Sequence, residues 1–298
     1  MKIRPAVPAD ADAIAEVCNA LSRALYGDPD VTAGEIRHWF TFPNVELFVG
    51  AEDGAIAAYL DLTFEESGTA EAYARVQPHA WGRGLADALL AYAEHRARRR
   101  PGIARLRTSA AEPDAELREA ADRRGYRPIR HSFTMEIELA RAPEVVVPEG
   151  FALDAYQHPA EEERVHEAQM DAFADHWDFH PIPIDRWRTY LTNRDNFDPT
   201  LWIVARADSE LAGVALNSWH PSGDPQAGWV NALGVRPAWR RRGLGEALLR
   251  ATFAKFAERG ATKVGLWVDA QNPTGAVRLY ERAGMRTVRR SDTYEKAL

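Results

Sequence analysis

The second half of the chain alternates short apolar runs with longer segments whose apolar residues recur at helical spacing. Runs of strand length lie at residues 151–156, 201–205, 211–218, 229–235 and 263–270. Amphipathic periodicity predicts helices over residues 161–173, 184–191 and 245–260, and a shorter one over 272–284. We interpret residues 286–298 as a closing hairpin. The order of these elements predicts mixed α/β structure with antiparallel strands first and a β-α-β-α-β ending.

The chain contains an internal duplication. The stretch "VRPAWRRRGLGEALL" (235–249) has a fainter copy, "VQPHAWGRGLADALL" (76–90), and a shift of 159 residues superposes the two without a gap. The same shift lays "EAADRRGYRPIRHSFTMEI" over "RLYERAGMRTVRRSDTYEK". A period of this length indicates duplicated domains rather than a solenoid. The proline-containing segment "LARAPEVVVPEG" is interpreted as a linker, so we predict domains over residues 1–140 and 141–298.

Composition narrows the classes of function. The 298 residues carry a formal net charge of -7, whereas a dedicated nucleic-acid binder leaves a basic footprint. The single cysteine, Cys18, excludes an intrachain disulfide framework and fits a reducing compartment. The start of the chain has no signal-peptide core, and no run approaches the roughly 20 apolar residues of a membrane span. We therefore predict a cytoplasmic protein without nucleic-acid or membrane partners, either a monomer or a homodimer.

The turn before the predicted helix 245–260 combines three arginines, Arg240–Arg242, with Gly243 and Gly245. Unpaired backbone N–H groups and the helix dipole at such a turn form an anion site, to which arginine adds charge that suits phosphate. The alternative is a plain strand-to-helix turn with solvated arginines. The glycine spacing fits neither a Walker A loop nor a dinucleotide-binding fingerprint, because the Lys-Ser/Thr pair and the third glycine are missing.

This motif resembles the acetyl-coenzyme A loop of the GCN5-related N-acetyltransferases (GNAT), whose signature is Arg/Gln-x-x-Gly-x-Gly/Ala. Here it is Arg240-x-x-Gly243-x-Gly245, and "NPTGAVRLYERAG" further along is similar to the family's Asn and Ala-x-x-x-Tyr-x-x-x-Gly signature. The duplication resembles the tandem type represented by mycothiol synthase. The resemblance implies two GNAT-fold domains, each a mostly antiparallel central sheet flanked by helices, and a catalytic C-terminal domain.

The resemblance also implies roles for individual residues. The pyrophosphate of acetyl-CoA would bind the backbone amides of Arg240, Arg241, Arg242, Gly243, Leu244 and Gly245. The main chain of Leu233, Gly234 and Val235 would pair with the pantetheine arm, and Asn272 would hydrogen-bond it. Tyr280 would protonate the leaving thiolate. The alternatives are a core aromatic for Tyr280 and a helix N-cap for Asn272.

The first domain departs from the family pattern. Trp81 replaces the first arginine, and Pro113 and Ala121 replace the Asn and the Tyr. A possible cofactor site remains at Val76, Arg83, Gly84 and Ala86. We predict a degenerate domain that performs no acetyl transfer and either still holds acetyl-CoA or supports the second domain.

The acceptor pocket of this family is built from early helices and loops, here "AQMDAFADHWDFHPIPIDRW" (168–187). Candidates that could bind or deprotonate an amine, or stack on it, are Asp175, His176, Trp177, Asp178, His180 and Trp187. Asn217 and His220 are weaker candidates. The resemblance to mycothiol synthase implies a Glu base at the start of the third strand, but Trp229 stands there, so the base comes from elsewhere or through water. Metal binding by His176 and His180 is a rival interpretation; we predict no metal.

The leading hypothesis is an acetyl-CoA-dependent N-acetyltransferase that acts on the primary amine of a small molecule by direct attack. The first alternative is acetylation of a protein or peptide amine. The second is a non-catalytic sensor that binds acyl-CoA.

Overall fold

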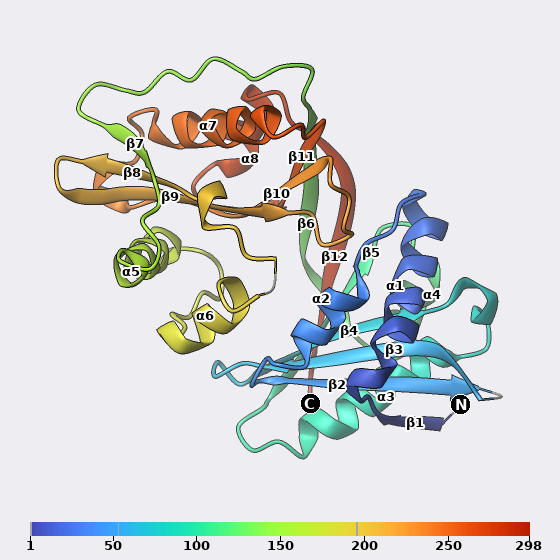
Figure 1. The fold of residues 1–298 in the computed structure, drawn as a ribbon. Coiled ribbons are helices and arrows are strands. Elements are labelled where there is room, and N and C mark those ends of the chain that lie inside the picture. The colour runs from blue at the N-terminus through green and yellow to red at the C-terminus, as the bar shows by residue number, and fades with distance from the viewer. Residues whose placement is uncertain (1, 53, 195) are drawn as a thin grey trace. The chain divides into compact units, whose positions relative to one another are not determined.

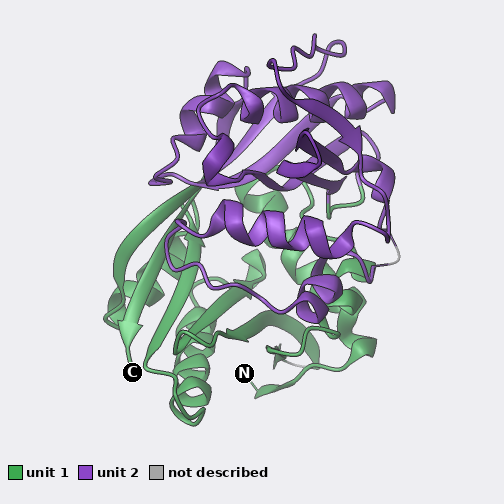
Figure 2. Ribbon diagram, turned by 90° about the vertical axis from the view of Figure 1, so that its left-hand side faces the viewer, with its two compact units in different colours: residues 1–132, 221–223, 290–298 green, residues 133–220, 224–289 purple. Residues whose placement is uncertain are grey.

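The computed structural model describes residues 2–52, 54–194 and 196–298. The chain divides into two compact units, coloured separately in Figure 2. Unit 1 comprises residues 1–132, 221–223 and 290–298, and unit 2 comprises residues 133–220 and 224–289. The boundary near residue 140 stays a prediction about the linear sequence, since the units themselves are not continuous segments.

Unit 1 is a mostly antiparallel sheet flanked by helices. Its first strands are β1 (Lys2–Pro5), β2 (Val45–Glu52), β3 (Ala55–Phe64), β4 (Thr69–Val76) and β5 (Arg105–Ala111). Its helices are α1 (Ala11–Tyr26), α2 (Ala33–Trp39), α3 (Leu85–Arg98) and α4 (Ala115–Arg123). Strands β1 to β4 pair antiparallel in chain order, and β4 pairs parallel with β5. The predicted α/β class is therefore confirmed for this half.

Unit 2 repeats this arrangement. Its strands are β7 (Ala152–Ala155), β8 (Ile203–Ala207), β9 (Glu210–Trp219), β10 (Ala227–Val235) and β11 (Lys263–Asp269). Its helices are α5 (Glu162–Phe173), α6 (Ile184–Leu191), α7 (Leu244–Glu258) and α8 (Ala276–Arg282). Strands β7 to β10 pair antiparallel in chain order, and β10 pairs parallel with β11. Each predicted helix and strand up to residue 284 is confirmed, with ends shifted by a few residues.

The last strand of each repeat extends into the unit formed mainly by the other repeat and joins its sheet. β6 (Arg127–Glu138) ends in unit 2, where it lies beside β11. β12 (Arg286–Ala297) ends in unit 1, where Ser291 to Ala297 pair antiparallel with Ala111 to Arg105 of β5. Each unit's sheet is thus completed by a strand from the opposite end of the duplication.

The predicted closing hairpin at residues 286–298 is wrong, because β12 is one continuous strand. The polar stretch "RRSD" (289–292) lies inside this strand, where Arg290 pairs with Asp292. The Arg290 guanidinium donates to Oδ1 of Asp292 at 2.9 and 3.0 Å. Two residues further on, Tyr294 is 4% exposed and packs in the unit 1 core. Cross-strand pairing with β5 therefore overrides the local turn signal.

Helices cover both faces of the unit 2 strands. Figure 1 shows α7 on one face and α5 on the other. Gly234 of β10 permits the close approach of α5, since a Cβ there would lie 2.8 Å from the Cβ of Ala172. This packing places the C-terminal end of α5 over the end of β10.

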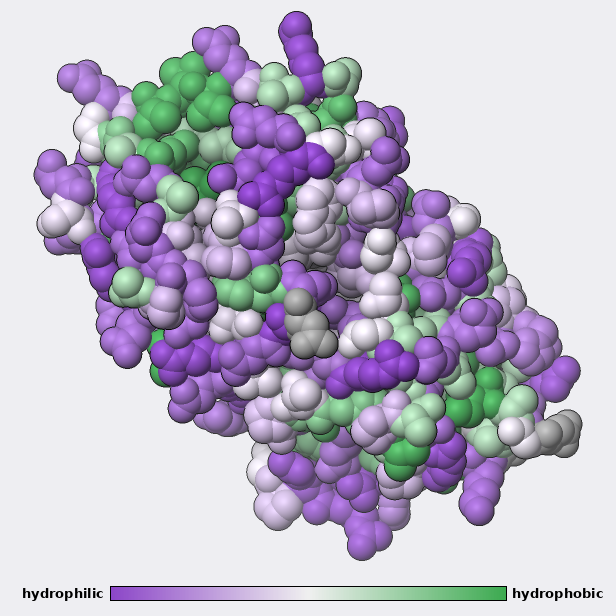
Figure 3. Space-filling view, in the orientation of Figure 1, coloured by the Kyte–Doolittle hydropathy of each residue, from purple (hydrophilic) through white to green (hydrophobic). Residues whose placement is uncertain are grey.

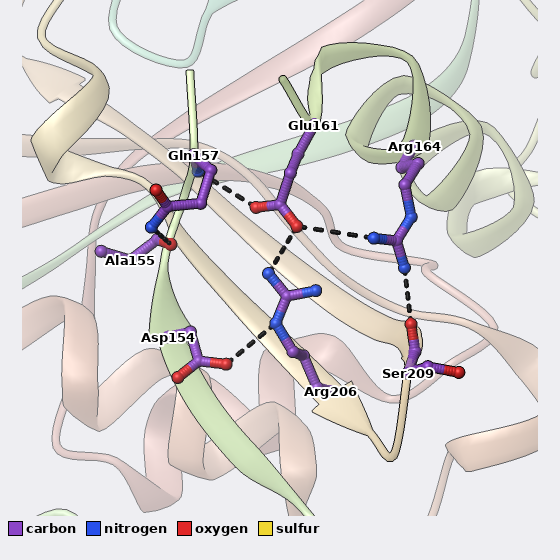
Figure 4. Close-up of polar contacts among 7 residues, drawn as sticks. All are labelled: Asp154, Ala155, Gln157, Glu161, Arg164, Arg206 and Ser209. Carbon is purple, nitrogen blue, oxygen red and sulfur yellow. Dashed lines mark hydrogen bonds and ion pairs between the residues drawn. The ribbon is translucent and has the colours of Figure 1, made fainter. Parts of the chain in front are cut away.

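An ion-pair network anchors the N-terminal end of α5, as Figure 4 shows. The Arg206 guanidinium binds the carboxylates of Glu161 and, at 2.9 Å, Asp154. Burial alone would raise the pKa of Glu161, but its hydrogen bonds from Arg206 and the Gln157 amide outweigh burial and lower the pKa. Arg164 lies 3.6 Å from Glu161 and also donates to the Ser209 carbonyl at 2.6 Å. The start of α5 is thereby fixed to β7 and β8.

The face seen in Figure 3 carries mostly hydrophilic side chains with smaller hydrophobic patches between them. Among the described residues, every helix is too short or too polar to cross a lipid bilayer. Oligomeric state, nucleic-acid binding and cellular location stay predictions of the sequence.

Candidate active site of unit 2

Strands β10 and β11 separate part-way along their length. They pair from Ala227 opposite Lys263 to Val230 opposite Leu266, although β10 continues to Val235. A β-bulge interrupts the register of β10 with β9 between Val230 and Ala232, and bulges bend the strand that carries them. Beyond this point β10 pairs with β9 alone among the described strands, so the edge that faces β11 can accept an extended ligand as an added strand.

The loop between β10 and α7 has the backbone of an anion-binding site. After the 3-10 turn η4 (Pro237–Trp239), Arg241 adopts φ 63 and Gly243, the N-cap of α7, adopts φ 83. Left-handed residues within a turn can direct backbone N–H groups into one concavity. No side chain caps the first turn of α7, so its N–H groups and helix dipole face outward. Glycine at 243 avoids the strain that a side chain would add at this positive φ.

The open strand edge, the loop and α8 surround one cavity of about 660 Å³. This volume falls in the range of small-molecule and cofactor sites. The predicted cofactor residues that line it are Leu233, Gly234, Val235, Arg240, Arg241, Gly243, Leu244 and Gly245. The same cavity is lined by Tyr280, Asp175 and His176. The structure therefore brings most of the predicted cofactor residues together with two acceptor-pocket candidates.

The Arg240 side chain is held by groups at the ends of α5 and β10. Its guanidinium binds the Asp175 carboxylate through both Nη atoms and donates to the Ala172 carbonyl at 3.0 Å. Its Nε donates to the Val235 carbonyl at 3.0 Å. Because these bonds join the end of β10 to the end of α5, the side chain of Arg240 positions the loop, and its charge is already paired.

Tyr280 lies on α8 and is 7% exposed. Burial raises the pKa of its hydroxyl to about 12. The side chain belongs to the unit 2 core as well as to the cavity lining. Both interpretations of Tyr280 therefore describe part of its position: the ring packs as a core aromatic, and the residue reaches the cavity.

His176 lies just beyond the C-terminal end of α5 and is half-buried. Burial lowers the pKa of its imidazole, and the nearby Arg240 lowers it further against the opposing influence of Asp175 and Asp269. The ring packs on Phe173, with centroids 4.4 Å apart. Hydrogen bonding from Arg240 lowers the pKa of Asp175. At neutral pH the cavity thus contains an uncharged imidazole beside a paired carboxylate.

Several other predicted residues lie outside this cavity. Arg242 is exposed on the loop, and Trp177 and His180 are exposed on the segment after α5. Trp229 packs over Gly265 and, edge to face, on His220 at 4.9 Å.

Asn217 and Trp187 are core residues. The Asn217 amide donates to the Leu201 carbonyl at 2.8 Å and to the Thr252 hydroxyl at 3.3 Å, and its residue is 2% exposed. Trp187 is fully buried and donates from Nε1 to Gln169 at 2.7 Å. The prediction that Trp187 stacks on a ligand is therefore wrong; the apolar periodicity of α6 had pointed to the core instead.

Asn272 forms a local turn. Its Oδ1 accepts hydrogen bonds from the Thr274 amide at 2.9 Å and the Thr274 hydroxyl at 2.6 Å. It does not line the cavity, whereas the next three residues do. The N-cap of α8 is Gly275, so the alternative role of Asn272 as a helix N-cap is wrong.

Sequence reasoning missed three polar residues that line the cavity: Glu246, Thr274 and Arg282. It also missed that Asp269, at the end of β11, acts electrostatically on His176. Position at a helix or strand end was the available signal for Glu246 and Asp269. In the part of the chain that the structure describes, no group of three His, Cys, Asp or Glu residues is arranged to hold a metal ion.

The possible site in unit 1 has the same order of elements. Val76 ends β4, Arg83 and Gly84 precede α3, and Ala86 is fully buried in its first turn. β4 and β5 also separate, since their pairing stops at Ala72 opposite Thr108.

Comparison with known proteins gives the family. The model of the Acetyltransferase (GNAT) family matches residues 13–126 and again residues 162–285. The mycothiol acetyltransferase of Geodermatophilus obscurus is 32% identical over 251 residues, which cover 80% of this chain and 78% of that protein. The protein of the same name from Nocardia farcinica is 30% identical over 285 residues, covering 92% and 86%.

Solved structures agree with this result. A GCN5-related N-acetyltransferase from Sphaerobacter thermophilus has a TM-score of 0.81 and 31% identity, and the match covers 99% of this chain and 95% of that one. A tandem GNAT protein from the clavulanic acid biosynthesis pathway has a TM-score of 0.79 at 17% identity, with 99% and 98% covered, which supports the fold alone. Since the family model accounts for both halves and the relatives match over most of their length, the chain is an N-acetyltransferase of the GNAT family, of the tandem type that resembles mycothiol synthase.

Proposed function

We propose that unit 2 transfers the acetyl group of acetyl-CoA to the primary amine of a small molecule by direct attack. The observation that carries this proposal is the single cavity that joins an anion-binding loop, an open strand edge and Tyr280. Unit 1 has alanine, Ala121, at the position of Tyr280, which is why we assign the chemistry to unit 2.

The residues present fit the cofactor. The uncapped amides of the loop and of the first turn of α7 suit a pyrophosphate, and Arg241 adds positive charge at the rim. The main chain of Leu233 to Val235 suits the extended pantetheine arm. Asn272 would have to leave its turn with Thr274 to hydrogen-bond this arm. Bound acetyl-CoA supplies an activated acetyl thioester.

Tyr280 serves as the general acid in this proposal. A hydroxyl whose pKa is raised to about 12 stays protonated at every physiological pH. It can therefore give its proton to the sulfur of the leaving thiolate and does not compete for the proton of the amine.

His176 serves as the general base. Its lowered pKa keeps the imidazole neutral at pH 7, as a proton acceptor must be, and it lines the same cavity as Tyr280. Asp175 is less suited, because Arg240 holds its carboxylate. The amine proton passes to His176 directly or through water, and the amine nitrogen forms the bond to the acetyl carbon.

The acceptor is a small amine, and the name of the relatives makes a mycothiol precursor the first candidate. By the resemblance to mycothiol synthase, a Glu base would be expected at the position of Trp229, so this chain requires a different base, for which we propose His176. Screening acetyl-CoA-dependent thiol release with a panel of small amines tests the substrate class, with cysteinyl glucosaminyl inositol and aminoglycosides included. Thiol release with peptide amines alone would contradict it.

Tyr280→Phe tests the acid. It keeps the packed ring and removes the proton, so we expect kcat to fall by roughly 10²- to 10⁴-fold while the affinity for coenzyme A changes little. Turnover and calorimetric titration measure the two effects. Unchanged turnover would remove Tyr280 from the mechanism.

A further inference from the structure

Unit 1 has kept the backbone of the anion-binding loop. The 3-10 turn η2 (Pro78–Ala80) is followed by Gly82 with φ 75 and Gly84, the N-cap of α3, with φ 74. The corresponding residues of unit 2, Arg241 and Gly243, have φ 63 and 83. The two loops therefore share left-handed residues at matching positions, a backbone pattern that suits a concave anion site.

In unit 1 this concavity already holds an anion, the carboxylate of Glu116. The Gly82 amide donates to Oε2 of Glu116 at 2.9 Å. Oε1 of the same carboxylate is buried and has no hydrogen-bond partner within the structure. A carboxylate with one oxygen on a backbone N–H and the other without a partner occupies the place of a phosphate without matching its hydrogen bonds.

A second contact, next to this one, joins α3 to α4. Arg123 of α4 binds Asp87, in the first turn of α3, at 2.6 Å. The residues at these positions in unit 2 are Arg282 and Glu246, and both line the open cavity. There Glu246 pairs with Arg250 of its own helix at 2.9 Å instead.

The counterpart of Glu116 in the repeat is Gly275, which also lines the cavity of unit 2 and has no side chain to place there. The two repeats thus share the loop. They differ in the following helix: α4 places the Glu116 carboxylate at the loop of unit 1, whereas the matching residue at the start of α8 is Gly275, which has no side chain. In unit 2 the loop lines an open cavity. In unit 1 the side chain of Glu116 binds the loop.

We propose that unit 1 retains a coenzyme A pyrophosphate site that the Glu116 carboxylate occupies as a built-in anion. Removal or displacement of this side chain opens the site. The inference rests on the proposed function, since unit 2 identifies the shared loop as a pyrophosphate site. Unit 1 would hold the cofactor without transferring acetyl, because Pro113 and Ala121 replace the Asn and Tyr of the catalytic repeat.

Calorimetric titration of the full-length protein with coenzyme A tests this proposal. We expect one site in the wild type and two in Glu116→Ala, with the affinity of unit 1 raised about tenfold or more by the loss of a charge-assisted hydrogen bond. Glu119→Ala is the matched control, because Glu119 lies on the same helix and pairs with Arg123 at 3.4 Å. Glu119→Ala should keep one site.

The background variant Gly243→Trp separates the two proposals by blocking the loop of unit 2. One site should then appear in the double variant with Glu116→Ala and none in Gly243→Trp alone. Two comparable sites in the wild type, or no additional site in both Glu116→Ala and Glu116→Gln, would overturn the inference. Absence of binding in unit 2 would overturn the proposed function, and the gain or lack of a site with Glu116→Ala would still decide for or against the inference about unit 1.

Discussion

His176 combines the properties that a proton acceptor for an amine needs. It lines the cavity with Tyr280, burial lowers its pKa, and Asp269 acts on it from the end of β11. The neighbouring candidates differ from it in position: Asp178 and His180 are exposed and lie outside the cavity lining. Position leaves His176 and Asp175, and because Arg240 holds the Asp175 carboxylate, His176 is the better suited of the two.

The pH dependence of kcat/KM tests the role of His176. Because its pKa lies below the ordinary value of 6.5, the neutral base form predominates above that pH, and the rate should fall as the pH drops through the lowered pKa. His176→Gln should lose this acid limb and about 10²- to 10⁴-fold in rate. Tyr280, with a pKa of about 12, adds no alkaline limb below pH 10. An acid limb that persists unchanged in His176→Gln with the same acceptor would contradict the assignment.

Asp61 of unit 1 gives a second pH prediction, one of stability. Burial raises its pKa to about 7, although Arg75 opposes the shift. The ordinary pKa of Asp is about 3.9, so between pH 4 and 7 the folded state binds more protons than the unfolded state. The free energy of unfolding should therefore fall as the pH rises through this range.

Asp61→Asn removes this titration at nearly constant side-chain size. Urea unfolding from pH 5 to 8.5 should show that the stability of the variant relative to the wild type rises up to about pH 7 and then levels off. Carboxylates with lowered pKa values, such as Glu94 and Asp175, stay charged throughout this window. Parallel curves for the two proteins would argue against a raised pKa of Asp61.

At the scale of elements, the proposed function assigns phosphate binding to the backbone of the loop before α7. Its first arginine joins β10 to the end of α5, and the amides around Gly243 remain open to the cavity. If the backbone binds the ligand and the arginine side chain only positions the loop, the loop conformation does not require that arginine. Unit 1 has the same positive φ values with Trp81 at this position.

Arg240→Met tests whether the arginine side chain only positions the loop. The Asp175–His176 segment should become less ordered, so kcat should fall, whereas the affinity for coenzyme A should fall less than in Gly243→Trp, which blocks the loop itself. Steady-state kinetics and calorimetric titration separate the two effects. Arg242→Met, at an exposed position outside the cavity lining, is the control and should change neither. A loss of coenzyme A affinity as large as that of Gly243→Trp would mean that Arg240 contacts the phosphate.

At the scale of the whole molecule, the two repeats exchange their last strands. β12 supplies unit 1 with Tyr294 in its core, with Glu295 on the buried Arg107 at 2.8 Å, and with Lys296 on Glu94 at 3.0 Å. Each compact unit therefore depends on residues from both halves of the duplication.

Deletion of residues 290–298 should destabilise unit 1, although these residues come from the second repeat. The deletion uncovers the edge of β5, and burial of an aromatic side chain such as Tyr294 is by itself worth about 1.5–3 kcal/mol. Hydrogen exchange monitored by mass spectrometry should show loss of protection in β5. The conservative variant Tyr294→Phe should keep that protection. Protection of β5 that is unchanged by the deletion would contradict the assignment of β12 to unit 1.

The sequence by itself determined the helices and strands of the second repeat up to residue 284, the duplication and the glycine-containing turn before α7. These features depend on hydrophobic periodicity and on local dihedral preferences, which neighbouring residues set among themselves. Gly243 could be recognised as a turn residue for this reason, whereas Tyr280 was singled out only by the resemblance to the family; both line the cavity.

Only the tertiary structure decided which distant partner each element and side chain takes. It paired β12 with β5, turned Arg240 toward Asp175, buried Trp187 and placed Glu116 on Gly82. Each of these choices is a competition among groups far apart along the chain, settled by register, burial and charge pairing. A linear pattern does not contain the outcome of that competition. The sequence of the fainter copy therefore does not show that Gly82 and Gly84 adopt the same positive φ as Arg241 and Gly243, or that the Glu116 carboxylate accepts a hydrogen bond from the Gly82 amide.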